Sequence, residues 1–178
     1  SAGISISDGE TIHTRRGQGL ISEVCSRDEY LEFEGNQAIG HVRYTTAGDS
    51  GLLNAQPLVF RYTGGQVAVA HNGNLVNAKR LRDQLERQGS IFQTNSDTEV
   101  VSHLIARAGP PIDHAFQDAL RVIDGAYALL LMTEKQMIAA QDPRGFRPLS
   151  LGQFENAWVV SSETCALNTI GADFVREI

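Results

Sequence analysis

Apolar and polar positions alternate in several short runs along the chain. A period of two is typical of half-buried β-strands, because successive side chains of a strand point to opposite faces. Glycine-containing pairs such as Asp8-Gly9 and Gly64-Gly65 separate neighbouring runs, which favours antiparallel hairpins. The predicted strands lie near residues 4–6, 11–15, 38–44, 57–62, 66–71, 126–133, 137–141, 149–152 and 157–161.

Three stretches between these strands have the three- and four-residue apolar spacing of amphipathic helices. The first begins after Asn77, a good cap residue, and stops near Gly89. The second begins at Asp97, and the third covers residues 112–123 before Gly125. Their apolar stripes are Ala78, Leu81 and Leu85; Val100, Val101, Leu104 and Ile105; and Ala115, Phe116, Ala119 and Leu120.

The order of strands, then helices, then strands predicts an α+β fold rather than an alternating βαβ fold. The 178 residues suit one compact domain with a sizeable core, and no linker, repeat or low-complexity tract interrupts them. The longest apolar run, residues 126–132, is too short to cross a bilayer, and no secretory leader opens the chain. We therefore expect no membrane partner.

Charge and cysteine usage narrow the functional class. The formal net charge is −6 and basic residues are scattered, whereas nucleic-acid binding needs a clustered basic face. Cys25 and Cys165 are too few and too far apart for a disulfide framework or a four-thiolate metal site. The sequence therefore predicts two buried thiols in a reducing, cytoplasmic compartment and no nucleic-acid partner.

Asn72-Gly73 follows a predicted strand and has two interpretations. Asn-Gly is a strong hairpin-turn signal, because both residues tolerate positive φ. Alternatively, the Asn72 side-chain amide and the Gly73 N–H form an oxyanion hole, in which two donors face one developing negative oxygen.

Charged residues near this pair also have a structural and a functional interpretation. Ser96 and Glu99 fit a helix capping box, so Asp97 marks a helix start or binds a substrate ammonium group. Arg43 ends a strand and forms either a surface ion pair or a fork for a substrate carboxylate. His71 is predicted to be a hydrogen-bonded core histidine. Together, these groups suit a site that binds a free amino acid and attacks its side-chain carbonyl.

Several segments carry a specific resemblance, in the same order along nearly the whole chain. The chain closely resembles the glutamine phosphoribosyl-pyrophosphate amidotransferases, or amidophosphoribosyltransferases, which make the first committed step of purine synthesis. Glucosamine-6-phosphate synthases share the Arg and His-Asn-Gly elements but differ elsewhere. The segments that carry the resemblance are residues 40–44, 70–78, 89–94, 96–100, 142–150 and 162–166. Residues 142–148 also read as a rigid turn.

The resemblance implies the four-layer αββα sandwich of the N-terminal-nucleophile hydrolases. It implies that Arg43 holds the glutamine carboxylate and Asp97 its ammonium group, while Asn72 and Gly73 form the oxyanion hole. Thr46 would belong to a loop, rich in Gly, Ser and Thr, that closes over glutamine.

In this family the nucleophile is a cysteine at the mature N-terminus, whose α-amine takes the thiol proton. Here residue 1 is Ser1, which aligns within the family's second strand, so the sandwich is expected to be incomplete at its N-terminus. Cys25 stands at an internal apolar position, and Ser1 aligns too far along the chain to replace the cysteine. We therefore expect a truncated glutaminase domain, 1–178, that is inactive in isolation.

The resemblance also predicts partners and cofactors. Glutamine, a phosphoribosyltransferase domain of the parent protein and further copies of that protein are the expected partners. No cofactor is expected in this chain, whereas the parent enzyme would use Mg²⁺ and, in some members, an iron–sulfur cluster. A glutamine-binding module without a nucleophile and a non-catalytic scaffold remain as alternatives.

Overall fold

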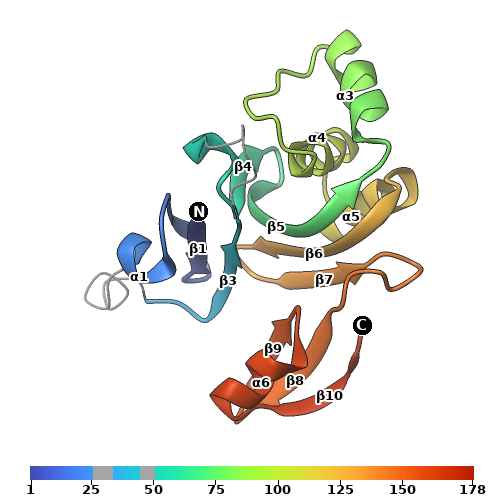
Figure 1. The fold of residues 1–178 in the computed structure, drawn as a ribbon. Helices are drawn as coiled ribbons and strands as arrows, with labels where there is room; N and C mark the ends of the chain where they lie inside the picture. Colours follow the sequence, from blue (N-terminus) through green and yellow to red (C-terminus); the bar gives the residue numbers. More distant parts are fainter. Residues whose placement is uncertain (26–33, 45–50) are drawn as a thin grey trace.

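The computed structural model describes residues 1–25, 34–44 and 51–178, and its strands form antiparallel sheets (Figure 1). The sheets have the orders β2-β1-β3, β4-β5-β6-β7 and β10-β8-β9. The strands are β1 (Ala2–Ser7), β2 (Ile12–Gly17), β3 (Gln37–Val42), β4 (Leu58–Tyr62), β5 (Gly65–Leu75), β6 (Gly125–Thr133), β7 (Met137–Gln141), β8 (Ser150–Phe154), β9 (Ala157–Ser161) and β10 (Asp173–Glu177). The helical elements are α1 (Ile21–Val24), the 3-10 helix η1 (Leu52–Asn54), α3 (Ala78–Arg87), α4 (Thr98–Ala108), α5 (Ile112–Val122) and α6 (Thr164–Ile170).

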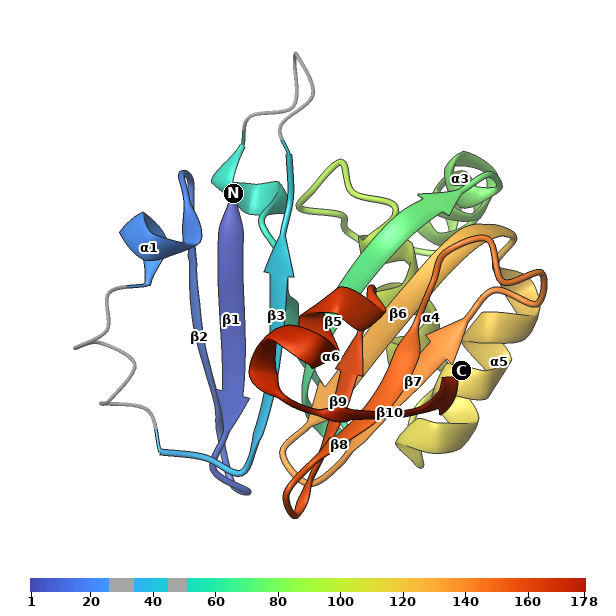
Figure 2. The same ribbon diagram turned by 60° about the horizontal axis from the view of Figure 1, so that its bottom comes forward.

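Strand β5 lies in the middle of the fold, because its two faces belong to different cores. Val67 and Val69 pack with the apolar stripes of α3, α4 and α5 in the larger core. Ala68 and Ala70 face the opposite side, where they contact Ile39 of the β2-β1-β3 sheet. Helices therefore cover one face of the four-stranded sheet and a second sheet covers the other (Figures 1 and 2). This arrangement confirms the predicted mixture of helices and sheets.

The β10-β8-β9 sheet carries α6 on one face. Leu167 of α6 is almost fully buried and packs so closely that a Cβ on Gly152 would lie 2.9 Å from it. Figure 2 shows β9 on the same side of the four-stranded sheet as β3. A hollow of about 520 Å³ lies between these two strands and is lined by residues of β3, β5, β6, β9 and α6.

The turn predicted at Asn72-Gly73 is wrong. Strand β5 continues through both residues to Leu75, and they pair in register with Ala128 and Tyr127 of β6. The long pairing with β6 overrides the local turn preference, because it satisfies the backbone hydrogen bonds of β5 within the sheet.

In the last part of the chain, the structure differs from the predictions. Helix α6 and strand β10 were not predicted, because neither segment has a regular apolar period. Cys25 is buried beside Ala2 and Val24, as predicted, but Cys165 is exposed, so that prediction was wrong. The short helix α6 buries Leu167, and Cys165 lies on its other side. No helix in the described parts of the chain is long and apolar enough to span a membrane.

The predicted rigid turn after β7 forms around the carboxylate of Asp142. This carboxylate is buried and accepts hydrogen bonds from the backbone N–H groups of Arg144, Phe146, Arg147 and Tyr127 at 3.0–3.3 Å. Burial acts to raise the pKa of Asp142, but these four N–H donors outweigh it and lower the pKa below its ordinary value. The ionised carboxylate therefore fixes the turn to the start of β6.

We expect Asp142→Ala to lower the free energy of unfolding by about 2–3 kcal/mol, because it leaves buried N–H groups without an acceptor. Urea denaturation at neutral pH measures the change. Asp118→Ala is the control, since Asp118 forms an exposed ion pair with Arg121, and its effect should stay within about 0.5 kcal/mol. Equal effects of the two substitutions would contradict the role given to Asp142.

Candidate active site

A cavity of about 710 Å³ lies where the end of β3, the end of β5 and the segment before α4 meet. Four residues singled out in the sequence, Arg43, Asn72, Gly73 and Asp97, all line it. Thr46 lies outside the described residues. The remaining lining residues are Gly40, His41, Val42, Tyr44, Gln56, His71, Asn74, Asn95, Ser96 and Ser162.

Arg43 lies directly after β3, and the first sheet fixes its backbone. The Arg43 N–H donates to the carbonyl of Ser1 at 2.8 Å, and the Ser1 amine donates to the Arg43 carbonyl at 2.9 Å. The edge of the sheet therefore places the guanidinium-bearing residue at the cavity wall. Ser1 itself is not one of the residues that line the cavity.

Gly73 is required where it stands, because β6 approaches its Cα closely. A Cβ built on Gly73 would lie 2.1 Å from the Ala126 carbonyl oxygen and 2.8 Å from Nε2 of His71. The φ angle of Gly73 is +155°, which side-chain-bearing residues rarely adopt. The side of Gly73 on which any other residue would carry a side chain is therefore filled by β6 and the His71 ring.

Asp97 is anchored to the strand that carries Asn72 and Gly73. Its Oδ2 accepts a hydrogen bond from the Leu75 N–H at 2.9 Å, and its Oδ1 lies 3.4 Å from Nδ1 of His71. Burial acts to raise the pKa of Asp97, but His71 and the N–H groups of Leu75 and Thr98 lower it below its ordinary value. Asp97 is therefore an anion at neutral pH.

The capping box predicted from Ser96 and Glu99 does not form. Ser96 Oγ accepts from the Thr98 N–H, at 3.3 Å. The Glu99 carboxylate instead accepts from the N–H groups of Gln93 and Thr94 at 2.8 and 2.7 Å. Glu99 therefore fixes the preceding loop, and α4 begins without a side-chain cap at Asp97.

His71 and His41 connect the elements around the cavity, and neither was predicted to do so. His71 is only 4% exposed, and its Nδ1 lies 3.1 Å from Oγ1 of Thr98. Its backbone N–H donates to Oε1 of Gln56, and its carbonyl lies 3.1 Å from Nε2 of His41. His71 is therefore a core histidine, as predicted, but its Nε2 has no hydrogen-bond partner among the described residues.

The residues that were not predicted to belong to the site differ in how visible they are in the sequence. His41 is two residues before Arg43 on the same strand, so the period of two places both on one face of β3. Gln56, Thr98 and Ser162 come from three separate segments, and each is an ordinary polar residue in its local sequence. Their place in the site depends on tertiary contacts that no local pattern encodes.

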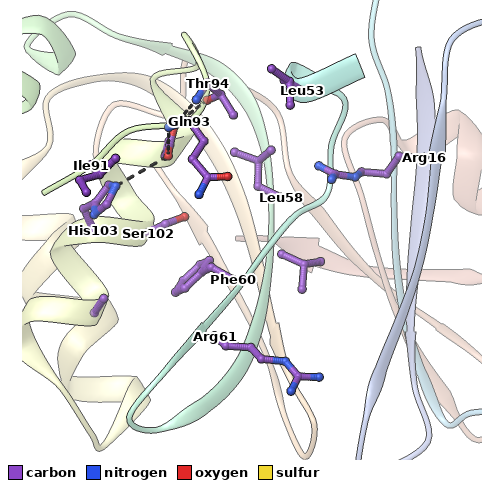
Figure 3. A pocket seen from close by; sticks show the side chains of 13 residues that line it. Arg16, Leu53, Leu58, Phe60, Arg61, Ile91, Gln93, Thr94, Ser102 and His103 are labelled. Carbon is purple, nitrogen blue, oxygen red and sulfur yellow. Dashed lines mark hydrogen bonds and ion pairs between the residues drawn. The ribbon is translucent and has the colours of Figure 1, made fainter. Parts of the chain in front are cut away.

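A different cavity of about 400 Å³ opens between η1, β4 and α4 (Figure 3). Leu58, Phe60 and Ile91 give it apolar walls, and Arg61 supplies a cation. It shares no lining residue with the cavity at Arg43 and contains none of the groups predicted to bind an amino acid. The cavity at Arg43 is therefore the candidate site.

The site combines a cation, an anion and two amide donors within one hollow. This combination suits a free amino acid whose side chain carries a carbonyl group. Neither Cys25 nor Cys165 lines the cavity. In the described parts of the chain, no group of three or more His, Cys, Asp or Glu residues is placed to hold a metal ion.

Gly73→Ala should lower the free energy of unfolding by about 1–3 kcal/mol or more, because the added Cβ forces β5 and β6 apart. Chemical denaturation of the full chain measures the loss. Gly40→Ala is the matched control, since a Cβ there would lie at an ordinary 3.7 Å from the Gly3 carbonyl oxygen. A Gly73→Ala variant as stable as Gly40→Ala would be inconsistent with the close approach described above.

The stability of the fold should also depend on the protonation of His41. Burial lowers the pKa of His41 below its ordinary value, even though its bond to the His71 carbonyl acts in the opposite direction. The unfolded chain therefore takes up this proton first as the pH falls. The contribution of His41 to the free energy of unfolding is therefore fully present above about pH 6.5. It is lost as the pH falls through the pKa of His41 in the folded state.

We expect the free energy of unfolding to fall between pH 8 and pH 5, and to fall less in His41→Gln, which keeps a donor near the Nε2 position. Denaturation at a series of pH values, with both proteins in the same buffers, measures the difference. Identical slopes for the two proteins would rule out His41 as a contributor.

Comparisons with known proteins point to one family. A model of the glutamine amidotransferase domain matches residues 41–169. The chain is 54% identical over 179 residues to an amidophosphoribosyltransferase of Bacillus subtilis, covering 99% of this chain and 38% of the relative. It is 49% identical to a chloroplastic amidophosphoribosyltransferase 2 of Arabidopsis thaliana, covering 98% of this chain and 32% of the relative.

Solved structures give the same result. The chain matches a glutamine phosphoribosylpyrophosphate amidotransferase of B. subtilis with a TM-score of 0.93 and 52% identity, over 99% of this chain and 38% of that one. A structure described as the allosteric regulatory enzyme of purine biosynthesis matches with a TM-score of 0.95 and 54% identity, again over 99% of this chain and 38% of that one. The resemblance found in the sequence is confirmed, and the chain belongs to the family of glutamine amidotransferase domains.

Proposed function

We propose that this chain is the glutamine-binding and glutamine-hydrolysing part of an amidophosphoribosyltransferase. The observation that carries the proposal is the single cavity in which Arg43, Asp97 and the Asn72-Gly73 pair meet. The chain spans 38% of the length of the B. subtilis relative, so the activity of the whole relative exceeds what this chain contains.

Glutamine would lie between the two charged residues. The Arg43 guanidinium forms a planar fork that matches the α-carboxylate, and the Asp97 carboxylate pairs with the α-ammonium group. Asp97 suits this role because it is ionised at neutral pH and each of its oxygens retains a lone pair beyond the contacts described. Binding both ends of the amino acid selects a free amino acid over an amide within a peptide.

The glutamine side-chain carbonyl would then face the oxyanion hole. The Asn72 amide and the Gly73 N–H donate to the oxygen that becomes negative when a nucleophile attacks the amide carbon. Such donors act mainly on the transition state, and removing one typically costs about 3–4 kcal/mol. Strand β5 holds both residues rigidly, because each of them pairs with a residue of β6.

The nucleophile would be a cysteine with a free α-amine, as in the family. Cys25 is buried beside Ala2 and Val24, and Cys165 lines only the hollow between β3 and β9. That hollow shares His41, His71 and Asn72 with the glutamine cavity. A strand inserted between β3 and β9 would join the two smaller sheets, complete the four-layer αββα sandwich and bring its first residue to the oxyanion hole.

In the whole enzyme, attack on the amide carbon gives a thioester and releases ammonia. Residues 1–178 would form one type 2 glutamine amidotransferase domain, and a phosphoribosyltransferase domain would use the ammonia to displace pyrophosphate. Mg²⁺, any iron–sulfur cluster and the association of copies would belong to that larger assembly. The described residues would supply the glutamine-binding groups and the oxyanion hole of that reaction.

Calorimetry tests the substrate assignment. The chain should bind glutamine, and Arg43→Ala and Asp97→Asn should each weaken binding about tenfold or more, since each removes one charge-assisted contact. Arg61→Ala is the matched control, because Arg61 lines the other cavity and should leave binding unchanged. Binding that is insensitive to both site variants would refute the assignment.

Hydrolysis is a separate test. Incubation of the chain with glutamine should release no ammonia above the spontaneous rate, as measured by an enzyme-coupled ammonia assay. Sustained turnover by this chain, lost in Asn72→Ala, would show that a residue within it acts as the nucleophile.

A further inference from the structure

His71 occupies the point where the three parts of the site meet. Its side chain is nearly inaccessible to solvent, at 4% exposure, although it lies at the wall of a cavity. Its backbone is part of β5, immediately before Asn72, and its ring reaches the start of α4 at Asp97 and Thr98. His71 therefore connects the strand that carries Asn72 and Gly73 with the helix start that carries Asp97.

The contacts of the His71 ring indicate which of its two nitrogens carries the proton. Nδ1 lies 3.4 Å from Oδ1 of Asp97 and 3.1 Å from Oγ1 of Thr98. An ionised carboxylate only accepts hydrogen bonds, so Nδ1 carries the proton when it faces Asp97. Nε2 has no partner among the described residues. The geometry therefore favours a ring that is protonated at Nδ1.

The opposite edge of the ring faces the oxyanion-hole backbone. Nε2 lies 2.8 Å from the position that a Cβ on Gly73 would take. The ring thus fills the space beside the Gly73 Cα, and its own backbone is held by Gln56 at 2.6 Å. A movement of His71 would be transmitted to Gly73 and to Asp97 together.

We propose that His71 is a positioning residue that holds the Asp97 carboxylate in place to bind the α-ammonium group of the substrate. This inference rests on the proposed function, because it assumes that glutamine occupies the cavity. His71 does not touch glutamine in this arrangement. The Leu75 N–H donates to one oxygen of Asp97, and Nδ1 of His71 lies 3.4 Å from the other, so contacts at both oxygens limit rotation of the carboxylate.

A purely structural role makes a different prediction. If His71 only fills the core, replacing it would weaken every ligand of the cavity to a similar extent. If His71 acts through Asp97, its loss should weaken only ligands that carry an ammonium group. 4-Carbamoylbutanoate, which is glutamine without the α-amino group, separates these cases because it keeps the carboxylate and the amide.

The experiment compares glutamine and 4-carbamoylbutanoate by calorimetry with the full chain. In His71→Phe, glutamine should bind about tenfold more weakly, whereas the analogue should change by less than about threefold. His71→Asn should restore glutamine binding to within about threefold of the unsubstituted chain, since its amide nitrogen replaces Nδ1. An equal change for both ligands, or no change, would overturn the role of His71.

A measurement on the unsubstituted chain keeps the test independent of variant folding. Nitrogen NMR of the imidazole ring should show the proton on Nδ1, and glutamine should shift this resonance more than the analogue does. A proton on Nε2 alone would contradict the proposed role of His71, because Nδ1 could not then donate to Asp97. If the unsubstituted chain binds neither ligand, the proposed function fails instead.

Discussion

The hydrogen bond from the Leu75 N–H to the Asp97 carboxylate fixes the geometry on which the site depends. It joins the end of β5 to the start of α4, which also meet through the His71 ring at Asp97 and Thr98. Because Asn72 and Gly73 are on the same strand, this bond sets the spacing between the anion and the two amide donors. A hydrogen bond to a charged acceptor is stronger than one to a neutral acceptor. The bond between Leu75 and Asp97 therefore also resists separation of β5 from the start of α4.

Much of the fold follows from local periodicity. The helices at residues 78–87, 98–108 and 112–122 begin and end close to the predicted limits, since each has a continuous apolar stripe. The alternation of Ile4 and Ile6 with serines identified β1, but the structure buries Ser5 and Ser7 instead. Ser5 bonds to the Thr14 hydroxyl and Ser7 to a backbone carbonyl, so hydrogen bonds, which hydropathy does not describe, select the buried face.

The candidate site could be predicted only in part. Arg43, Asn72, Gly73 and Asp97 were identified because their residue types match the needs of amino-acid binding and of an oxyanion. The Asn-Gly pair also shows the limit of local reasoning, because its turn preference is overridden by nine residue pairs between β5 and β6. The roles of Gln56, His71 and Thr98 depend on contacts between segments 15 to 42 residues apart, and sequence patterns do not contain these contacts.

His41 and His71 lie where the cavity at Arg43 meets the neighbouring hollow. Nδ1 of His41 and Nε2 of His71 have no hydrogen-bond partner among the described residues, and both residues line the glutamine cavity and the neighbouring hollow. An unsatisfied buried polar atom typically costs about 1–3 kcal/mol, so a hydrogen-bonding group that enters the cavity or the hollow would stabilise this junction. The two histidines mark the boundary where the substrate-binding strands meet the hollow proposed to receive the nucleophile. On the proposed assignment, glutamine would bind on the Arg43 side of these histidines, and the nucleophile would approach from the side of the hollow.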